Sequence, residues 1–474
     1  MKEKKGQMNM TEGSPLRIII MFTIPIILGN IFQQLYNIGD AKVVSYYLDK
    51  NAFAAVGMTG VVSNMLIGLV NGFTQGFGIL VANAYGAKDI KRLKRNIAGS
   101  SVLTAGITIV LLAVSLCFVR NVLVLLNTPP EMMSLSVRYI RIIIIGLPFT
   151  ALYNLSANIL RSIGDSRTPL YCLVASIILN IILDIVFVGF IHMGIEGAAF
   201  ATVVSQLICS TSCFIYGIRH FKEYMPGKDD FSVSGFEYWN LFIMGLSMGL
   251  MGCIVNIGTI ILQSAINGLG SGIVAAHTAG RRLLDITMAF IYTFGATMTT
   301  YTSQNYGAGR YDRIRKGVKT AIYIVSVISL ILIIFTFLFA RQIVTWIAST
   351  DTSLIKDNAT MYCMVGVTFY PVLGPLFILR CVLQGIGRKI IPLFSSFMEL
   401  AIKVLSAYLL VARMGYVGIA FTEPISWVVM TMILAIGYFI AIRELKSEEV
   451  KSETVKSKAV KSKDEQSESD NQQM

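Results

Sequence analysis

Four polar residues in the first half of the chain interrupt apolar stretches long enough to be membrane helices: Asp40, Asn180, Asp184 and Thr202. A charge at the centre of a bilayer costs at least about 2.5–3.5 kcal/mol, so a carboxylate at such a position usually has a functional reason. Asn180 and Asp184 are one helical turn apart and therefore share a helix face. Counting about 1.5 Å per residue from the predicted helix ends places Asp40, Asp184 and Thr202 at a similar depth. The pattern predicts one polar layer built from three helices.

The chemistry open to this layer is the binding of a small cation. Two carboxyl groups in a low-dielectric pocket cannot easily both stay ionised, so one of them would hold a proton near neutral pH, as a proton carrier requires. The same oxygens, with the amide of Asn180 and the hydroxyl of Thr202, could instead bind Na⁺, a hard cation that prefers oxygen ligands. A purely structural alternative places Asp40 in an exposed loop and pairs Asp184 with a basic residue.

The helices that must position these residues are evident from composition. Of the 474 residues, 54% are hydrophobic and only 14% are charged, against about 25% charged in a soluble domain. A bilayer core of about 30 Å needs about 20 apolar residues per helix, and backbone groups in lipid must be paired within the helix. The chain is therefore predicted to be an all-α integral membrane protein with twelve transmembrane helices, near residues 15–46, 52–83, 96–118, 136–159, 168–190, 194–218, 236–266, 273–303, 317–340, 358–382, 390–412 and 416–441.

Composition also excludes several classes of protein. The basic residues behind the net charge of +13 lie in short clusters between apolar runs, which indicates contact with membrane lipid and not with nucleic acid. The seven cysteines form no CxxC pair and the three histidines are scattered, so we expect no disulfide framework and no metal site apart from the Na⁺ alternative. No span carries a nucleophile–base pair or a P-loop. We predict that the protein is not an enzyme, has no cofactor and does not use ATP directly.

The two halves of the chain resemble each other. Residues 81–87 (VANAYGA) match residues 302–308 (TSQNYGA) at an offset of 221, and Pro148 meets Pro371 at an offset of 223. Each repeat holds six predicted helices, an even number, so both halves insert the same way up. This predicts two pseudo-symmetric six-helix bundles with a cleft between them, which is typical of transporters that alternate access. A duplication without a transport role is the alternative.

The polar layer is not repeated. The second half has other residues at the equivalent positions: Asp40 aligns with Ile261, Asn180 with Lys403 and Asp184 with Ala407. Because the second bundle is expected to fold without these polar groups, function explains their presence in the first bundle better than folding does.

Basic residues assign the orientation, since cytoplasmic loops carry an excess of Lys and Arg. With the N-terminus inside, the predicted inner loops hold most of the basic loop residues. We therefore predict that both termini are cytoplasmic and that the chain divides into an N-terminal segment (1–14), an N-lobe (15–218), a cytoplasmic linker (219–235), a C-lobe (236–442) and a tail (443–474). The tail is low in complexity and lacks aromatic residues, which predicts disorder.

Several motifs resemble those of the multidrug and toxic compound extrusion (MATE) family. They are TIP at 23–25, LYNIGD at 35–40, LRSIGD at 160–165, NIILD at 180–184 and GAAFAT at 197–202, together with the paired Tyr-Gly-Ala loops. Each motif is short, but their order and spacing together are specific. The resemblance covers residues 12–443.

The resemblance implies a secondary active antiporter in a bacterial plasma membrane. Such a protein exports organic, cationic or amphiphilic compounds in exchange for H⁺ or Na⁺, acts as a monomer and alternates access between its two lobes. In the DinF-like branch of the family the coupling ion binds residues that match Asp40, Asn180, Asp184 and Thr202, and a proline that matches Pro25 bends the first helix. A lipid or polysaccharide flippase of the same superfamily is the alternative, disfavoured by twelve helices instead of fourteen.

The NorM-like branch uses acidic residues in the seventh and tenth helices, and this chain departs from that pattern. Its predicted seventh helix has only Glu237, at the start, and the tenth has none in its centre. Other charges in the second half are interpreted as structural pairs or as cavity lining: Arg281 with Asp285, and Glu399 with Lys403, both spaced i,i+4, and Glu423, which aligns with Thr202. The candidate substrate-cavity residues are Gln34, Asn37, Asn154, Asn256, Gln263, His277, Arg281 and Asp285.

Overall fold

The computed structural model describes residues 7–48, 50–126, 128–348 and 352–472, and no β-strand occurs within these ranges. The first half comprises α1 (Pro15–Tyr47), α2 (Lys50–Gly86), α3 (Ile90–Leu125), α4 (Pro130–Ile145), α5 (Leu147–Ser162), α6 (Arg167–Asp184), the π-helix η1 (Ile185–Phe190) and α7 (Gly194–His220). A short 3₁₀ helix, η2 (Lys228–Phe231), lies in the linker. The second half comprises α8 (Gly235–Asn267), α9 (Ser271–Gly307), α10 (Tyr311–Ala348), α11 (Ser353–Thr368), α12 (Tyr370–Gly385), α13 (Ile390–Met414) and α14 (Tyr416–Gln472).

Two of the predicted helices are bent where single straight helices were expected. Helices α4 and α5 meet at 43°, and α11 and α12 meet at 53°. Pro148 and Pro371, which are equivalent in the repeat, stand in the first turn after each break, where proline cannot donate to the preceding helix. Nine of the described helices are long and apolar enough to cross a membrane, and each bent pair is one further span. Helix α9 is the twelfth, so the described chain forms the twelve predicted spans, six in each half.

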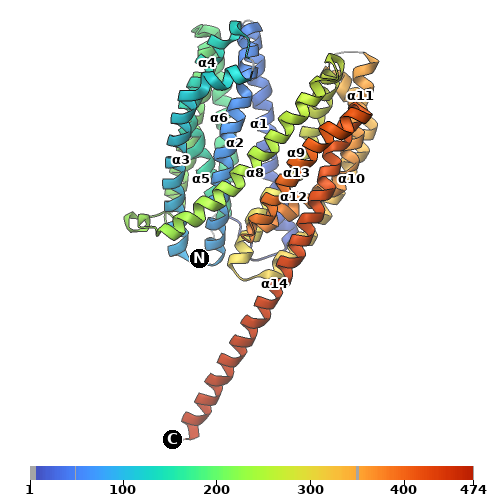
Figure 1. The fold of residues 1–474 in the computed structure, drawn as a ribbon. Helices are drawn as coiled ribbons and strands as arrows, with labels where there is room; N and C mark the ends of the chain where they lie inside the picture. Colours follow the sequence, from blue (N-terminus) through green and yellow to red (C-terminus); the bar gives the residue numbers. More distant parts are fainter. Residues whose placement is uncertain (1–6, 49, 127, 349–351, 473–474) are drawn as a thin grey trace.

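The two halves form two lobes that lie side by side (Figure 1). Both termini lie at the same end of the bundle, which we call the terminal side, and the lobes diverge toward the opposite end. Helix α8 begins against the N-lobe, where a Ser234–Glu237 capping box starts it and Glu237 lies 3.7 Å from Arg95 of α3. It then crosses to the C-lobe and packs on α13. The chain therefore changes lobe along α8.

Glycines allow the lobes to touch where α2 crosses α8. A Cβ atom added at Gly72 would lie 2.5 Å from Cα of Gly249, and one at Gly76 would lie 2.7 Å from Cα of Gly245. Both helices thus carry a GxxxG pair, the spacing that permits close backbone approach between membrane helices. The crossing brings the backbones of the two lobes into contact, and Phe73 and Phe77 of α2 pack beside Gly245 of α8.

The terminal side is closed in this structure. Gly86 and Gly307, equivalent in the repeat, pack against the other lobe so closely that a Cβ atom at either would lie 1.9 Å from a backbone oxygen, of Gln304 and Asn83 respectively. The N-terminal segment is wedged against both lobes. The Met8 N–H donates to Gly164 O at 3.0 Å, and the Met10 N–H donates to Gln304 Oε1 at 3.1 Å.

The C-terminal tail differs from the expectation of disorder after residue 443. Helix α14 continues to Gln472, and Figure 1 shows it extending beyond the bundle. The tail contains no Gly or Pro and is rich in Lys and Glu, which are strong helix formers, so composition that opposes burial does not oppose helix formation here.

Candidate ion-binding site

The polar residues predicted in the first half lie together where α1, α6 and α7 meet. Asn180 and Asp184 are 1% and 0% exposed on the last turns of α6. With its amide oriented to satisfy both groups, Asn180 donates to Asp184 Oδ2 at 3.0 Å and accepts from the Thr202 backbone N–H at 3.1 Å. Thr202 is half-buried, and its hydroxyl donates to Ala198 O at 3.1 Å. These contacts hold the amide and hydroxyl in place beside the carboxyl group.

Asp40 on α1 completes the cluster. Its carboxyl group lies close enough to that of Asp184 for the two to interact directly. Two neighbouring carboxyl groups away from water cannot easily both stay ionised, so the pair is suited to hold one proton. The structure therefore does not support the alternative in which Asp40 lies in an exposed loop and Asp184 pairs with a base.

Two oxygens of the pair have no partner. Oδ1 of Asp40 and Oδ1 of Asp184 are both buried and make no hydrogen bond with any described residue. Buried polar atoms are normally satisfied, so these two carboxyl oxygens are available to a cation, a proton or a water. Carboxyl, amide and hydroxyl oxygens together form a donor set that suits a hard cation.

The backbone is also unusual at this point. Helix α6 ends at Asp184, and the π-helix η1 begins with the next residue. Short π-helical segments within α-helices are frequent at functional sites because they re-aim the adjacent side chains.

Two tyrosines beside the cluster were not predicted as site residues. The Tyr36 hydroxyl lies 3.4 Å from Thr202 Oγ1, and buried Tyr139 on α4 lies close enough to Asp40, Asp184 and Tyr36 to interact with them electrostatically. Tyr36 and Asp40 are spaced i,i+4 and share one helix face, so the sequence did contain a signal for Tyr36. No local pattern connects Tyr139 with α1.

Pro25, predicted as a hinge, is buried inside α1, 15 residues before Asp40. Its missing N–H leaves one intrahelical hydrogen bond unmade. The residues around it contact the other lobe: Thr23 Oγ1 lies 2.8 Å from Thr297 Oγ1 of α9.

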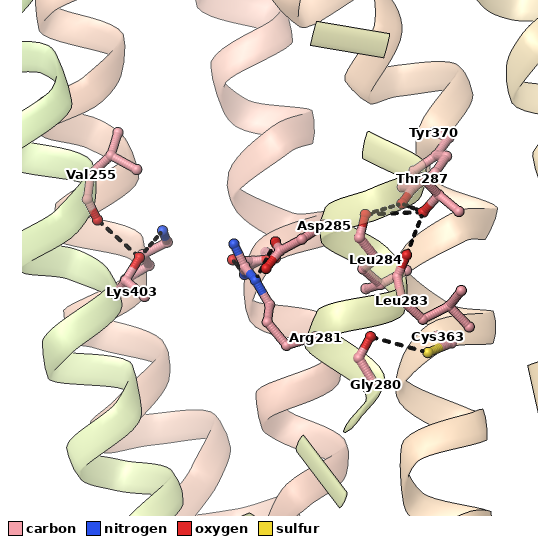
Figure 2. A network of polar contacts seen from close by, with 12 residues as sticks. Val255, Gly280, Arg281, Leu283, Leu284, Asp285, Thr287, Cys363, Tyr370 and Lys403 are labelled. Carbon is pink, nitrogen blue, oxygen red and sulfur yellow. Dashed lines mark hydrogen bonds and ion pairs between the residues drawn. The ribbon is translucent and has the colours of Figure 1, made fainter. Parts of the chain in front are cut away.

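The charges of the C-lobe form a separate network (Figure 2). Arg281 lies between Asp285, at 2.8 Å, and Glu423, at 2.6 Å. Its pairing with Asp285 was predicted from the spacing, whereas the pairing with Glu423 joins residues 142 positions apart. On α13, Lys403 pairs with Glu399 at 3.0 Å and donates to Thr259 Oγ1 at 3.5 Å.

Some of the predicted cavity residues lie together and others do not. Gln263, His277 and Arg281 line one cavity of about 200 Å³ in the C-lobe, with Glu423. Asp285 is outside that lining, with its side chain half exposed. Gln34 and Asn256 are exposed on α1 and α8, and Asn154 is half-buried on α5. The side chain of Asn37 lies outside the described residues.

Twelve membrane helices in two repeated lobes, with a buried carboxyl pair in one lobe, form the architecture of a membrane transporter. The sequence model of the MatE family matches residues 25–186 and 247–409, one segment in each lobe. The chain belongs to the MATE family, as its motifs predicted. It is a multi-span membrane transporter and not an enzyme.

Similar proteins span nearly the whole chain. It is 27% identical over 442 residues to the probable multidrug resistance protein YoeA of Bacillus subtilis strain 168, which covers 90% of this chain and 94% of the relative. It is 22% identical over 426 residues to the multidrug export protein MepA of Staphylococcus aureus strain MSSA476, covering 88% and 92%. The fold matches an outward-facing multidrug resistance MATE transporter with a TM-score of 0.87 at 24% identity, covering 94% of this chain and all of the other.

Proposed function

We propose that this protein is an antiporter that exports organic, cationic or amphiphilic compounds in exchange for H⁺ or Na⁺. The observation that carries the proposal is the Asp40–Asp184 carboxyl pair, whose two Oδ1 atoms are buried without a partner. A group that holds one proton, and that offers two further oxygens, is suited to bind and release a single small cation.

The C-lobe supports the assignment of coupling to the N-lobe. The residues equivalent to Asn180 and Thr202 are Lys403 and Glu423, and both already take part in ion pairs, with Glu399 and with Arg281. In the C-lobe, the cations Lys403 and Arg281 therefore already neutralise Glu399 and Glu423, at the level where a transported cation would bind in the N-lobe. Among the residues that the structure describes at this level of the repeat, the N-lobe carboxyl oxygens are free of internal cations and the C-lobe ones are not.

Helix α1 is suited to connect the ion site with the lobes. It carries Asp40 near one end and Pro25 in its interior, and its Thr23 hydroxyl is hydrogen-bonded with Thr297 of the C-lobe. In the proposed cycle, a cation from outside changes the contact between Asp40 and Asp184, α1 bends at Pro25, and the substrate leaves outward. The cation must favour one state by a few kcal/mol for this to work.

The remaining assignments follow from the sequence. The terminal side, with its excess of basic loop residues, would be the cytoplasmic face of a bacterial plasma membrane. The closed terminal side then corresponds to an outward-facing state. Asp285, with its half-exposed carboxylate, is the best contact for a cationic substrate, and the cavity lined by Gln263, His277 and Arg281 is the second candidate. The transporter would act as a monomer.

The test is export by the purified protein in proteoliposomes under a pH gradient or a Na⁺ gradient, each imposed alone. The proposal expects one gradient to drive accumulation of a fluorescent organic cation against its own gradient. Asp40→Asn should abolish that accumulation, whereas Glu237→Gln, at the start of α8, should keep it. Equal accumulation without any gradient, or full accumulation by Asp40→Asn, would contradict the proposal.

A further inference from the structure

A small polar cavity lies between the two lobes, away from the carboxyl pair. It measures about 40 Å³, roughly three times the 10–15 Å³ that one water needs. Its walls come from α1, α2 and α5 on one side and from α9 on the other, so both lobes build it. The polar residues that line it are Gln75, Asn158, Arg161, Ser162, Thr299, Thr300 and Ser303.

Arg161 is the charged residue of this cavity, and nothing in the described chain neutralises it. No described carboxylate lies within ion-pair distance of its guanidinium, and its Nε is buried without a hydrogen-bond partner. The nearest acidic residue along the chain, Asp165, directs its carboxylate elsewhere. It accepts from the Arg167 and Thr168 N–H groups, both at 3.0 Å, and so caps the start of α6.

The other polar groups divide into satisfied and unsatisfied ones. Asn158 donates to Thr74 Oγ1 at 3.1 Å, and Ser162 donates to Gly78 O at 2.7 Å. Gln75 and Thr300, in contrast, make no side-chain hydrogen bond with any residue the structure describes, although both face the cavity. Amide N–H, hydroxyl O–H and guanidinium N–H groups are all donors. The cavity therefore offers donors and a positive charge, without a carboxylate in its lining.

We infer that Arg161, Gln75 and Thr300 bind one small inorganic anion of the size of chloride. Arg161 is half-buried and its buried Nε has no partner, and a counter-ion would supply one while offsetting the cost of the partly desolvated charge. The volume of about 40 Å³ suits a halide with a water or two. Because Arg161 belongs to the N-lobe and Thr300 to the C-lobe, the anion contacts both. It stabilises the arrangement in which the terminal side is closed.

Thermal unfolding of the purified full-length protein tests this inference without any transport assay. Sodium chloride is titrated at constant ionic strength against sodium gluconate, whose anion cannot enter the cavity. We expect a saturable rise in Tm of about 2–3 °C at chloride concentrations about 100 times Kd. An identical response to both salts would overturn the inference, because it would mean that water alone fills the cavity.

Variants assign the effect to the site. Arg161→Gln should remove the chloride-specific rise, and Thr300→Val, which retains the guanidinium, should raise the chloride concentration at half-effect severalfold. Thr300→Val keeps the test decisive if Arg161→Gln does not fold. Arg167→Gln, which removes an exposed positive charge from the same end of the bundle, should respond like the wild type. A crystal grown with bromide should show its anomalous peak beside Arg161; retention of the chloride response by both cavity variants would refute the assignment.

Discussion

Asn30 on α1 donates from Nδ2 to Thr293 Oγ1 on α9 at 2.9 Å, and this hydrogen bond ties the two lobes together between Pro25 and Asp40. Thr293 in turn donates to Ala289 O at 2.6 Å, which fixes its hydroxyl as an acceptor for Asn30. With the Thr23–Thr297 contact on the other side of Pro25, the proline is bracketed by two links to the C-lobe. A bend at Pro25 that moved only the Asp40 end of α1 would break the Asn30 link and keep the Thr23 link.

Replacement of Asn30 should therefore change the balance between the two states of the transporter. Asn30→Leu removes one inter-lobe hydrogen bond, with a net value of about 0.5–1.5 kcal/mol, and should shift the equilibrium away from the closed terminal side by about 2- to 12-fold. Distances between spin labels on the terminal ends of the two lobes measure that population. Asn358→Ala, which removes only a local bond to Leu354 O, is the control. An unchanged distance distribution in Asn30→Leu would show that this bond does not hold the lobes together.

The carboxyl pair makes a second prediction. Asp184→Asn removes one of the two groups that share the proton, so cation binding and substrate export should uncouple. Gradient-driven accumulation should fall by about 5- to 150-fold, the range of a coupling free energy of 1–3 kcal/mol. Facilitated exchange of substrate without a gradient should persist. Substrate accumulation by Asp285→Asn, a variant of the other lobe, should still depend on the ion gradient even if its affinity for substrate changes.

The closed seam at the terminal side predicts a steric effect. In Gly86→Ala the new methyl group would meet the Gln304 backbone oxygen at 1.9 Å, and backbone cannot yield as a flexible side chain can. The variant should still fold, since the clash exists only when the lobes close, but it should favour the opened terminal side. Labelling of a single cysteine introduced on the seam should become faster by at least about tenfold, a shift of about 1.4 kcal/mol. Gly106→Ala, with open space around its Cβ, should label like the wild type.

The parts of this structure that were predictable from sequence are those with a local or repeated signature. Hydropathy predicted twelve spans, and the Asn180–Asp184 spacing predicted a shared face. The sequence showed the prolines Pro148 and Pro371 but did not predict the bends, because a helix can also continue straight past a proline. The burial of Met10 between the lobes was not predictable, because its partner Gln304 lies 294 residues away. The pairing of Glu423 with Arg281 was unpredictable for the same reason, because 142 positions separate the two residues.

The buried ion pair of the C-lobe makes the last prediction, which concerns stability. Arg281→Met leaves Glu423, whose side chain is 8% exposed, without its cation, and removal of one partner of a buried pair costs about 3–5 kcal/mol. For a chain of this length that corresponds to a fall in Tm of about 3–5 °C. The double variant Arg281→Met, Glu423→Met should recover most of the loss, because an apolar pair carries no desolvation penalty. Arg341→Met breaks an ion pair whose side chains are 66% and 59% exposed, and should change Tm by less than about 1 °C. If Arg281→Met and Arg341→Met were equally mild, Arg281 would not be neutralising Glu423, and the argument that internal cations occupy the C-lobe equivalent of the ion site would fail with it.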